Sequence, residues 1–476
     1  MKKRKKRAPG ADSEGVLPYR IDPEPLGTVA TSFSGLPLVA ELFRALGLEA
    51  SCRRHLRIKE RERGLTEAQF LEIFVLMFAA GGDCVDDLAR LREDPALPEL
   101  LGYPPPPPET GRLFLKAFHD EAIMAQRVHG TAWIPPESLP LKGLREVCKD
   151  AIRATYKLLP GRSLRTATLD HDATIIESSN REALPHYKGG RGYQPSFIIW
   201  KELDLIMADE FRDGNVNASF KNLPLIQEAF SLLPNDVKER YFRSDSACYE
   251  HVTMAWLKQN GVGFAISAKM STSLRRHIEA IPEESWHPHD HGRQFAEVPL
   301  FVPSGALKES NTEVPNRYIA IRKTQVQLRL PNMPDEEDKE GEERYWAVVT
   351  NLPWRSKKVL AWHREKAGTI EQTHRDLKDE LGLGTLPSGR FGVDAAWARL
   401  NVLAYNLLSM LRRTALPPAL KDARPKRLRY EVFQLAGLVI HHARTTFLRI
   451  AAGASRIAAL IQARYQVAGA VLALAG

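Results

Sequence analysis

One stretch of the sequence places carboxylates inside what is otherwise a buried strand. Residues 164–180 read LRTATLDHDATIIESSN, with apolar and β-branched residues in both halves and Asp170 and Asp172 in the middle. Because strand side chains alternate between faces, Asp170 and Asp172 point to one face and His171 to the other. An ionised carboxylate buried in a sheet is costly unless a cation or a hydrogen-bond donor offsets it. Alone, the stretch is compatible with aspartates that face water and with an acidic site.

The segments that follow predict a mixed sheet. A glycine-rich turn at residues 187–193, YKGGRGY, carries two cations. Strands are predicted over residues 197–200 and 203–211, which complete a three-stranded meander with the first strand. The further predicted elements are a helix over residues 223–233, a strand over 239–243 that ends at Asp245, a helix over 249–259 and a strand over 262–268. The order β-β-β-α-β-α-β requires helices on the faces of a mixed sheet and brings Asp172 within reach of Asp245.

A third carboxylate lies on a helix further along the chain. Residues 363–382 read HREKAGTIEQTHRDLKDELG. A helix that begins near Thr369 places Glu371, His374, Arg375 and Lys378 along one side, whereas Ile370, Leu377 and Leu381 pack inward. By itself this pattern is more typical of a surface helix with ion pairs. Three such carboxylates together can hold two divalent ions about 3.5 to 4 Å apart, and hard oxygen ligands select magnesium or manganese.

The N-terminal third is predicted to be a basic arm followed by helices. Residues 1–32 are predicted to be disordered and residues 33–103 helical, with one helix over residues 36–46. Thr66 opens a second helix, with Gln69 in the capping-box position, and Asp83 can cap a third over residues 85–92. This arrangement is a candidate DNA-binding helix-turn-helix with Arg90 and Arg92 exposed, although such pairs are more often structural.

The remaining boundaries follow from composition. Residues 104–160 hold a proline run and helices over 110–126 and 141–158, and residues 161–268 form the first part of the core. Residues 269–343 are a β-rich insertion, with strands over 318–323 and 325–330. Its histidines at 287–291 could bind zinc but lack an evident fourth ligand, so a solvated loop is favoured. Residues 344–413 are the second part of the core, with a strand over 345–350 and the Glu371 helix. Residues 414–476 are a basic helical region, and C-terminal helices are predicted over 395–412, 430–449 and 457–474.

Charge and cysteine content restrict the class of partner and compartment. The 476 residues include 67 Lys and Arg against 58 Asp and Glu, a formal charge of +9, which favours a nucleic acid partner. The four cysteines form no CxxC pair, so a reducing cytoplasm is expected. We expect no signal peptide, and the longest apolar runs are about half the ~20 residues of a membrane span, so we expect no membrane association.

These residues resemble the DDE transposases of bacterial insertion sequences, which share a ribonuclease H-like core with retroviral integrases. Asp172 in LDHDAT looks like the first acid of that family, Asp245 in FRSDSACY the second and Glu371 in GTIEQTHRDLK the third. The distance from Asp245 to Glu371 resembles the group with a strand-rich insertion there. The turn at 187–195, Gly214-Asn215 and a basic helix over 427–449 are also similar. Asp170 is the reserve candidate for the first acid.

One part of the family pattern is not met. The third motif of the family reads Y-x2-R-x3-E-x6-K, and residues 371–378 match its second half. The Tyr position holds Arg364 and the Arg position holds Ala367. His363 and Lys366 sit one residue early, where a local bulge would let them substitute.

The resemblance implies an α/β fold: a ribonuclease H-like mixed sheet with flanking helices, a β-rich insertion and helical N- and C-terminal regions. It implies a cytoplasmic, nucleoid-associated transposase that binds terminal inverted repeats as a homodimer on double-stranded DNA. Two Mg²⁺ ions, or Mn²⁺, would be held by the three acids for strand cleavage and strand transfer. The expected DNA contacts are Lys378, Arg375, His374, Lys366, Arg364, Lys188, Arg191 and Tyr193. The alternatives are a catalytically altered DNA-binding derivative and a general metal-dependent nuclease.

Overall fold

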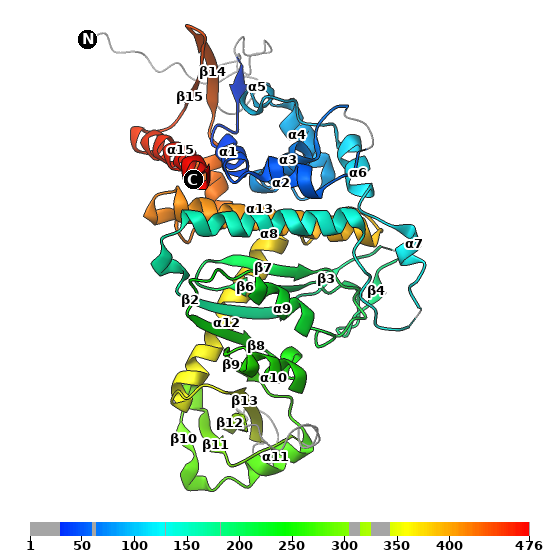
Figure 1. Cartoon of the computed structure of the whole chain (residues 1–476), viewed down its shortest axis with the longest axis vertical. Coiled ribbons are helices and arrows are strands. Elements are labelled where there is room, and N and C mark those ends of the chain that lie inside the picture. The colour runs from blue at the N-terminus through cyan, green and yellow to red at the C-terminus, as the bar shows by residue number, and fades with distance from the viewer. Residues whose placement is uncertain are drawn as a thin grey trace, which may run out of the picture.

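The structure is a computed structural model that describes residues 29–59, 63–128, 130–180, 182–303, 315–324 and 343–475. The elongated molecule has helices at one end, a sheet in the middle and a smaller strand-rich lobe at the other end (Figure 1). The predicted disorder of residues 1–28 and the predicted strand over 325–330 lie outside the described residues.

The centre of the molecule is a nine-stranded sheet in the order β10-β11-β12-β13-β9-β8-β2-β6-β7. Its core strands are β2 (Thr166–Ala173), β6 (Ser196–Trp200), β7 (Leu205–Glu210), β8 (Glu239–Ser244) and β9 (Gly263–Ser267). Strand β6 runs antiparallel to β2 and β7, whereas β8 is parallel to β2 and β9 is parallel to β8. The parallel pairs follow crossover helices α9 (Leu223–Ser231) and α10 (His251–Gln259). This arrangement is the predicted ribonuclease H-like core.

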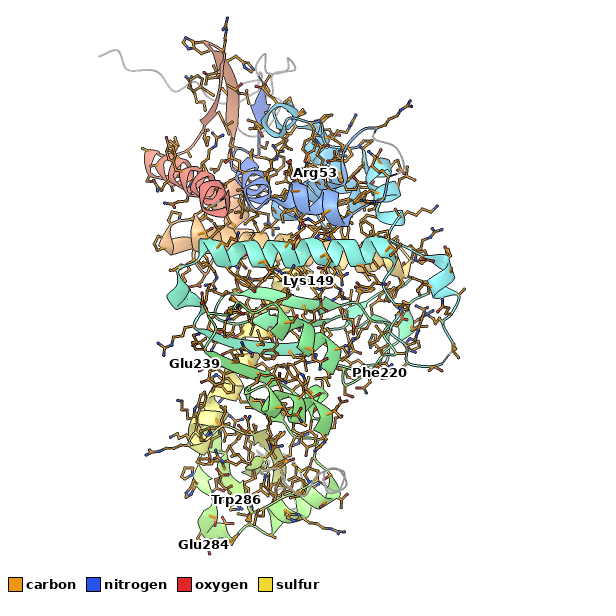
Figure 2. The ribbon with its side chains drawn as sticks, viewed as in Figure 1. Arg53, Lys149, Phe220, Glu239, Glu284 and Trp286 are labelled. Carbon is orange, nitrogen blue, oxygen red and sulfur yellow. The ribbon has the colours of Figure 1, made fainter. Side chains whose placement is uncertain are left out.

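The insertion extends the core sheet. Strands β10 (His287–Pro288), β11 (Gln294–Val298), β12 (Arg317–Thr324) and β13 (Glu343–Thr350) pair antiparallel in sequence order, and β13 pairs with β9. The strand-rich insertion was predicted, but its continuity with the core sheet was not. Trp286, labelled in the lower lobe in Figure 2, stacks on Arg322 of β12 at 4.3 Å. The β13–β9 ladder therefore joins the lobe to the core, and the Trp286–Arg322 contact packs the lobe internally.

The N-terminal helices form a layer on the long helix α13 (Phe391–Thr414). They are α1 (Pro37–Ala45), α2 (Leu48–His55), α3 (Glu67–Ala80), α4 (Leu88–Glu93), α5 (Leu97–Leu101) and α6 (Pro108–Lys116). The predicted capping box is present, because the Gln69 amide donates to Thr66 Oγ1 at 3.2 Å and the Thr66 amide to Gln69 Oε1 at 2.8 Å. Asp83 does not cap the next helix. Instead Asp87 accepts from the amides of Asp83 and Cys84, and the chain enters α4 through a 3-10 turn.

Helix α3 is buried on nearly all sides, since it packs between α2 and α13. Within the described ranges no single helix combines the length and apolar character of a membrane span. Only α3 taken together with residues 85–93 does, and that pair is bent by 97°.

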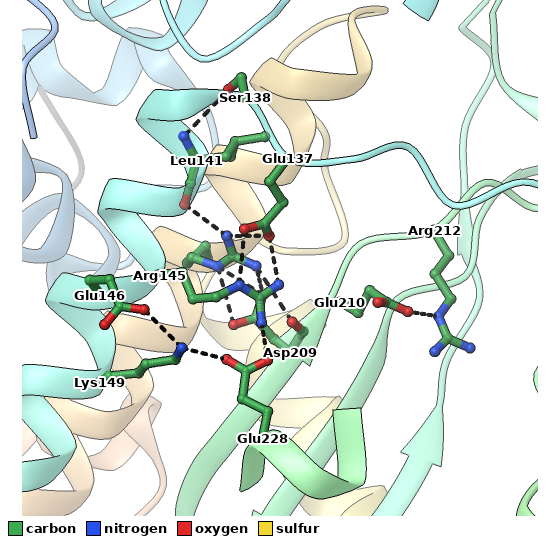
Figure 3. Close-up of polar contacts among 11 residues, drawn as sticks. Glu137, Ser138, Leu141, Arg145, Glu146, Lys149, Asp209, Glu210, Arg212 and Glu228 are labelled. Carbon is green, nitrogen blue, oxygen red and sulfur yellow. Dashed lines mark hydrogen bonds and ion pairs between the residues drawn. The ribbon is translucent and has the colours of Figure 1, made fainter. Parts of the chain in front are cut away.

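A buried ion-pair network ties the helical layer to the sheet (Figure 3). Arg399 of α13 contacts Asp209 of β7 at 2.9 Å and Glu137 at 2.7 Å, just before α8 (Leu139–Leu158). Arg145 of α8 contacts Glu137 at 2.6 Å and Glu228 of α9 at 2.7 Å. Burial raises the pKa of Glu137, but Arg399 and Arg145 outweigh it and lower the pKa to about 2. The network thus fixes both helices against the sheet edge.

The predicted helix over residues 430–449 is wrong. The chain forms a hairpin of β14 (Gly437–His442) and β15 (Thr445–Ile450), followed by α15 (Ala454–Ala475). Its residues are largely β-branched or aromatic, and Ala443 and Arg444 take φ of 47° and 62°, as a tight two-residue hairpin turn requires. Strand β14 also pairs with β1 (Ala30–Thr31), so part of the segment expected to be disordered is a strand.

Candidate active site

Three acidic side chains from distant parts of the chain line one pocket. Asp172 lies at the end of β2, Asp245 directly follows β8, and Glu371 lies on α12 (Ser356–Arg375). Strands β2 and β8 are parallel neighbours, so their carboxyl ends meet, and α12 contacts both. The pocket has a volume of about 480 Å³, and β12 and β13 of the insertion supply its apolar wall.

Burial and neighbouring charges shift the pKa of Asp172. Burial raises its pKa, the nearby Lys366 ammonium opposes that rise, and Asp245 and Glu371 reinforce it. Lys366 Nζ lies 3.7 Å from Asp172 Oδ1, and His374 Nδ1 lies 3.9 Å from Oδ2. Burial, Lys378 and Lys366 lower the pKa of His374 to about 3, so this ring is neutral. Arg293 and Arg364 also line the pocket, so its three acids share it with three cations, and Lys366 lies beside Asp172.

Asp170, the reserve candidate, has a different environment. Its side chain and that of Arg243 on β8 are both fully buried, and the two form a bidentate pair at 2.7 Å for each bond. Arg243 also donates to the backbone oxygen of Trp362 and stacks on its ring at 5.0 Å. Asp170 does not line the pocket. Its carboxylate holds α12 against the sheet through Arg243.

Two neutral histidines hold the segment that carries Asp245. On the far face of β2, His171 Nδ1 lies 3.2 Å from Ser244 Oγ, and Nε2 lies 2.9 Å from Ser196 Oγ. Ser244 Oγ in turn donates to Asp245 Oδ1 at 3.4 Å. Across the sheet, His363 Nε2 lies 3.1 Å from the backbone oxygen of Ser244. Burial lowers the pKa of His171 well below its usual value and that of His363 to about 4.

The sequence indicated none of these supporting roles, although a histidine between two aspartates in an apolar strand is a usable signal. The Asp245 carboxylate itself accepts from the Ala247 amide at 2.9 Å and caps the short turn after β8. Its orientation is therefore fixed by its own backbone and by Ser244.

Helix α12 begins at Ser356, thirteen residues before the predicted start near Thr369. The residues before Thr369 carry an apolar stripe of their own, with Val359 and Leu360 buried. His363 and Lys366 therefore lie on the same helix as Glu371, and all three line the pocket without a bulge. The irregularity lies later, where residues 376–380 form a π turn. The inward packing of Ile370, Leu377 and Leu381 was predicted correctly.

The structure separates the predicted DNA contacts into three groups. Lys366, His374 and Arg364 lie at the pocket, where Arg364 also pairs with Asp290. Lys188, Arg191 and Arg375 are exposed. Lys378 is half-buried, and its Nζ donates to Ile175 O at 3.0 Å. Burial lowers the pKa of Lys378, and the nearby Lys188 ammonium lowers it further. Tyr193 is 1 % exposed and its ring lies 4.9 Å from that of Phe211. A tyrosine in the core has no surface to offer DNA, so that expectation is wrong.

The donor set fits a hard divalent cation. Three carboxylates line the pocket, and their mutual repulsion is what such an ion would relieve. Among the described residues, however, only Asp83, Cys84 and Asp87 place three ligand atoms within 4.8 Å of one another. The three pocket acids are not that close together, so to share an ion they would have to move towards one another.

Comparisons with known proteins show the family of the chain. No curated protein matches the chain. Among solved structures, the cryo-EM structure of the piggyBac transposase synaptic complex with hairpin DNA is similar at 10 % identity and a TM-score of 0.40, covering 84 % of this chain and 77 % of that one. A family model described as transposase DDE domain, group 1, matches residues 19–468. Because that match spans the core, the insertion and both terminal regions, the chain belongs to the DDE transposase family.

Proposed function

We propose that this protein is the transposase of a bacterial insertion sequence. It binds the terminal inverted repeats of its element, cleaves the DNA strands and joins the freed 3′-hydroxyl groups to target DNA. The observation that carries the proposal is the meeting of Asp172, Asp245 and Glu371 in one pocket. They come from the first core strand, the end of the fourth and a helix beyond the insertion.

Each part of the pocket has a role in this proposal. Asp172, Asp245 and Glu371 hold two Mg²⁺ ions, with Mn²⁺ as a substitute. When bound, the ions activate the attacking hydroxyl and stabilise the charge that develops on the phosphate oxygens. Arg364, at the pocket rim, neutralises a phosphate beside the scissile bond. The apolar wall from β12 and β13 limits water around the reacting phosphate.

Four cations outside the pocket, three of them exposed and Lys378 half-buried, guide the DNA. Lys188 and Arg191 lie on the glycine-rich turn, and Lys378, on the turn after α12, lies near Lys188. With Arg375 they make sequence-independent phosphate contacts, so their removal weakens binding and its salt dependence without altering sequence preference. Both ends of the element must be held before joining, so we propose a homodimer in the DNA complex.

The test is single substitution of each acid. Asp172→Asn, Asp245→Asn and Glu371→Gln are each expected to lower cleavage of a fragment that carries the element ends by at least about 10³-fold in Mg²⁺ or Mn²⁺, while binding stays within a few-fold. Glu365→Gln is the matched control, because Glu365 lies on the same helix, pairs with Lys201 and does not line the pocket. Cleavage retained in all three acid variants contradicts the assignment.

The altered third motif favours one alternative, a transposase-derived DNA-binding protein without cleavage activity. Arg364 and Ala367 stand where the family has Tyr and Arg. A nicking assay with Mn²⁺ separates the two, since the alternative predicts binding without nicking. Equal cleavage of DNA that lacks element ends would instead identify a general nuclease.

A further inference from the structure

The C-terminal hairpin projects from the helical end of the molecule, far from the acid pocket (Figure 1). Its strands β14 and β15 are six residues each, and the pairing runs from Gly437↔Ile450 to His442↔Thr445. All seven residues from 441 to 447 are exposed. This ribbon is too small and too exposed to contribute much to the hydrophobic core. A contribution to the stability of the protein therefore does not explain why the hairpin is present.

The charged side chains of the hairpin are all basic. Residues 437–450 contain Arg444, Arg449, His441 and His442 but no Asp or Glu. On one face, His441 and Thr446 contact Glu99 of α5, at 3.2 Å each, which holds that face to the body. The cross-strand pairs of the other face include Ile440↔Phe447 and His442↔Thr445. The outer face therefore combines apolar groups with hydrogen-bond donors, and Arg444 lies at the tip.

The base of the hairpin is anchored rigidly. Strand β14 pairs with β1 as well as with β15, and Val439 is buried. Gly437 lies so close to Ser34 that an added Cβ would come within 2.2 Å of the Ser34 hydroxyl. A ribbon anchored in this way can hold its tip in a fixed position.

The hairpin also stands beside the helix pair that the sequence indicated as a helix-turn-helix. A groove of about 740 Å³ separates β15 from α4, with Arg449 on one side and Arg90 on the other, and Glu93 and Asp94 also line it. Segments from opposite ends of the chain thus present cations to the same groove. The mixture of exposed arginine, histidine, threonine and phenylalanine matches the donors, phosphate-binding groups and apolar contacts of a protein surface that binds DNA.

We infer that the β14–β15 hairpin is a wing that enters a groove of duplex DNA, and that it acts with Arg90 of α4 as one DNA-binding unit. This inference rests on the proposed function. The major groove, about 12 Å wide, admits a two-stranded ribbon. Arg444 and His442 contact base edges or phosphates from the tip, and Phe447 packs on sugars or thymine methyl groups. Because the wing lies far from the acids, it holds DNA without taking part in cleavage.

A second copy of the chain is the alternative to DNA as the binding partner of the hairpin. Strand β15 is the outer strand of its small sheet, so its edge is open to pairing with another strand. Two such edges would, however, bring cationic strands together with no acidic residue on either one. The charge therefore favours a polyanion.

Charge reversal at the tip tests the inference in the full-length protein. Arg444→Glu is compared with Lys238→Glu, whose exposed lysine precedes Glu239 at the start of β8, away from the hairpin (Figure 2). Binding is measured by fluorescence anisotropy with a random-sequence duplex of about 30 base pairs at several salt concentrations. Arg444→Glu should weaken binding at least about tenfold and make the slope of log K against log salt shallower by about 1, whereas Lys238→Glu should stay within about twofold.

The outcomes are distinguishable. Equal binding by Arg444→Glu and the wild type overturns the inference, whereas failure of the wild type to bind any duplex overturns the proposed function. Phe447→Glu, followed by light scattering, tests the second copy: a change in oligomeric state with unchanged DNA affinity also overturns the wing. Circular dichroism confirms that each variant is folded.

A tethered cleaver locates the tip on the DNA. Cys52, Cys148 and Cys248 are buried, so Ala443→Cys in a Cys84→Ser background offers one accessible thiol at the tip for an iron–EDTA group. The wing predicts cuts confined to a few nucleotides on both strands across one groove. Uniform cutting along the duplex, or none, contradicts it.

Discussion

Replacing Asp170 and Asp172 in turn tests whether Asp170 is a structural acid and Asp172, two residues away, is the catalytic acid that we propose. Asp170→Asn removes the buried counter-ion of the fully buried Arg243 guanidinium and leaves only the exposed Glu365 carboxylate, 3.6 Å away. Breaking a buried ion pair by removing one partner costs about 3 to 5 kcal/mol, so we expect a loss of that size in the free energy of unfolding. Asp172→Asn removes a charge that burial and two neighbouring acids already disfavour, so its stability should change by about 1 kcal/mol or less.

Guanidinium unfolding followed by circular dichroism measures the stabilities, and cleavage of element-end DNA measures activity. We expect Asp172→Asn to be stable and inactive, and Asp170→Asn to be destabilised but to cleave at temperatures where it is folded. The double variant Asp170→Leu with Arg243→Met replaces the pair with apolar groups and should recover most of the lost stability. A stable, inactive Asp170→Asn beside an active Asp172→Asn would refute the reasoning and make Asp170 the first acid.

Three further substitutions test the supporting structure. Burial raises the pKa of Asp394 to about 8, so its carboxyl is protonated at neutral pH. The stability of the protein should therefore fall as pH rises from about 4 to 8. Thermal unfolding measured across this pH range should show the fall in the wild type and not in Asp394→Asn. Glu137, whose pKa is lowered to about 2, gives stability the opposite dependence on pH. Its ionised form stabilises the fold above pH about 4.5, and that stability is lost on acidification towards pH 2; Glu137→Gln should abolish this loss. His171→Phe should unanchor Ser244 and lower cleavage about tenfold or more, with DNA affinity unchanged in the anisotropy assay.

Regular patterns predicted the core of the fold well. The strands around Asp172 and Asp245 formed where apolar runs and turn residues indicated them, because each run is buried and each turn is local. The capping box at Thr66 was also correct, since both of its hydrogen bonds are set by four consecutive residues. Where local sequence determines local structure, the prediction needed no tertiary information.

The wrong predictions concern segments whose structure is determined by tertiary contacts. Residues 430–449 were predicted to be a helix from their basic character, but strand β14 acquires a partner, β1, from the far end of the chain. No local pattern reveals that partner. Tyr193 was expected at the surface because it ends a glycine-rich turn, yet the rings of Phe211 and Phe391 enclose it. The anchoring of Asp245 through His171 likewise depends on strand register, which places His171 opposite Ser244.

The departure from the family's third motif has a geometric meaning on helix α12. An α-helix turns about 100° per residue, so a cation four residues before Glu371 would lie about 40° from it, whereas Lys366, five residues before, lies about 140° away. Lys366 is therefore directed from the far side of the helix towards β2, and its ammonium lies 3.7 Å from Asp172. Glu371 itself stays exposed at the pocket. Lys366 thus lies beside Asp172 instead of beside Glu371, and an ion that binds Asp172 would share its carboxylate with Lys366 or displace that lysine.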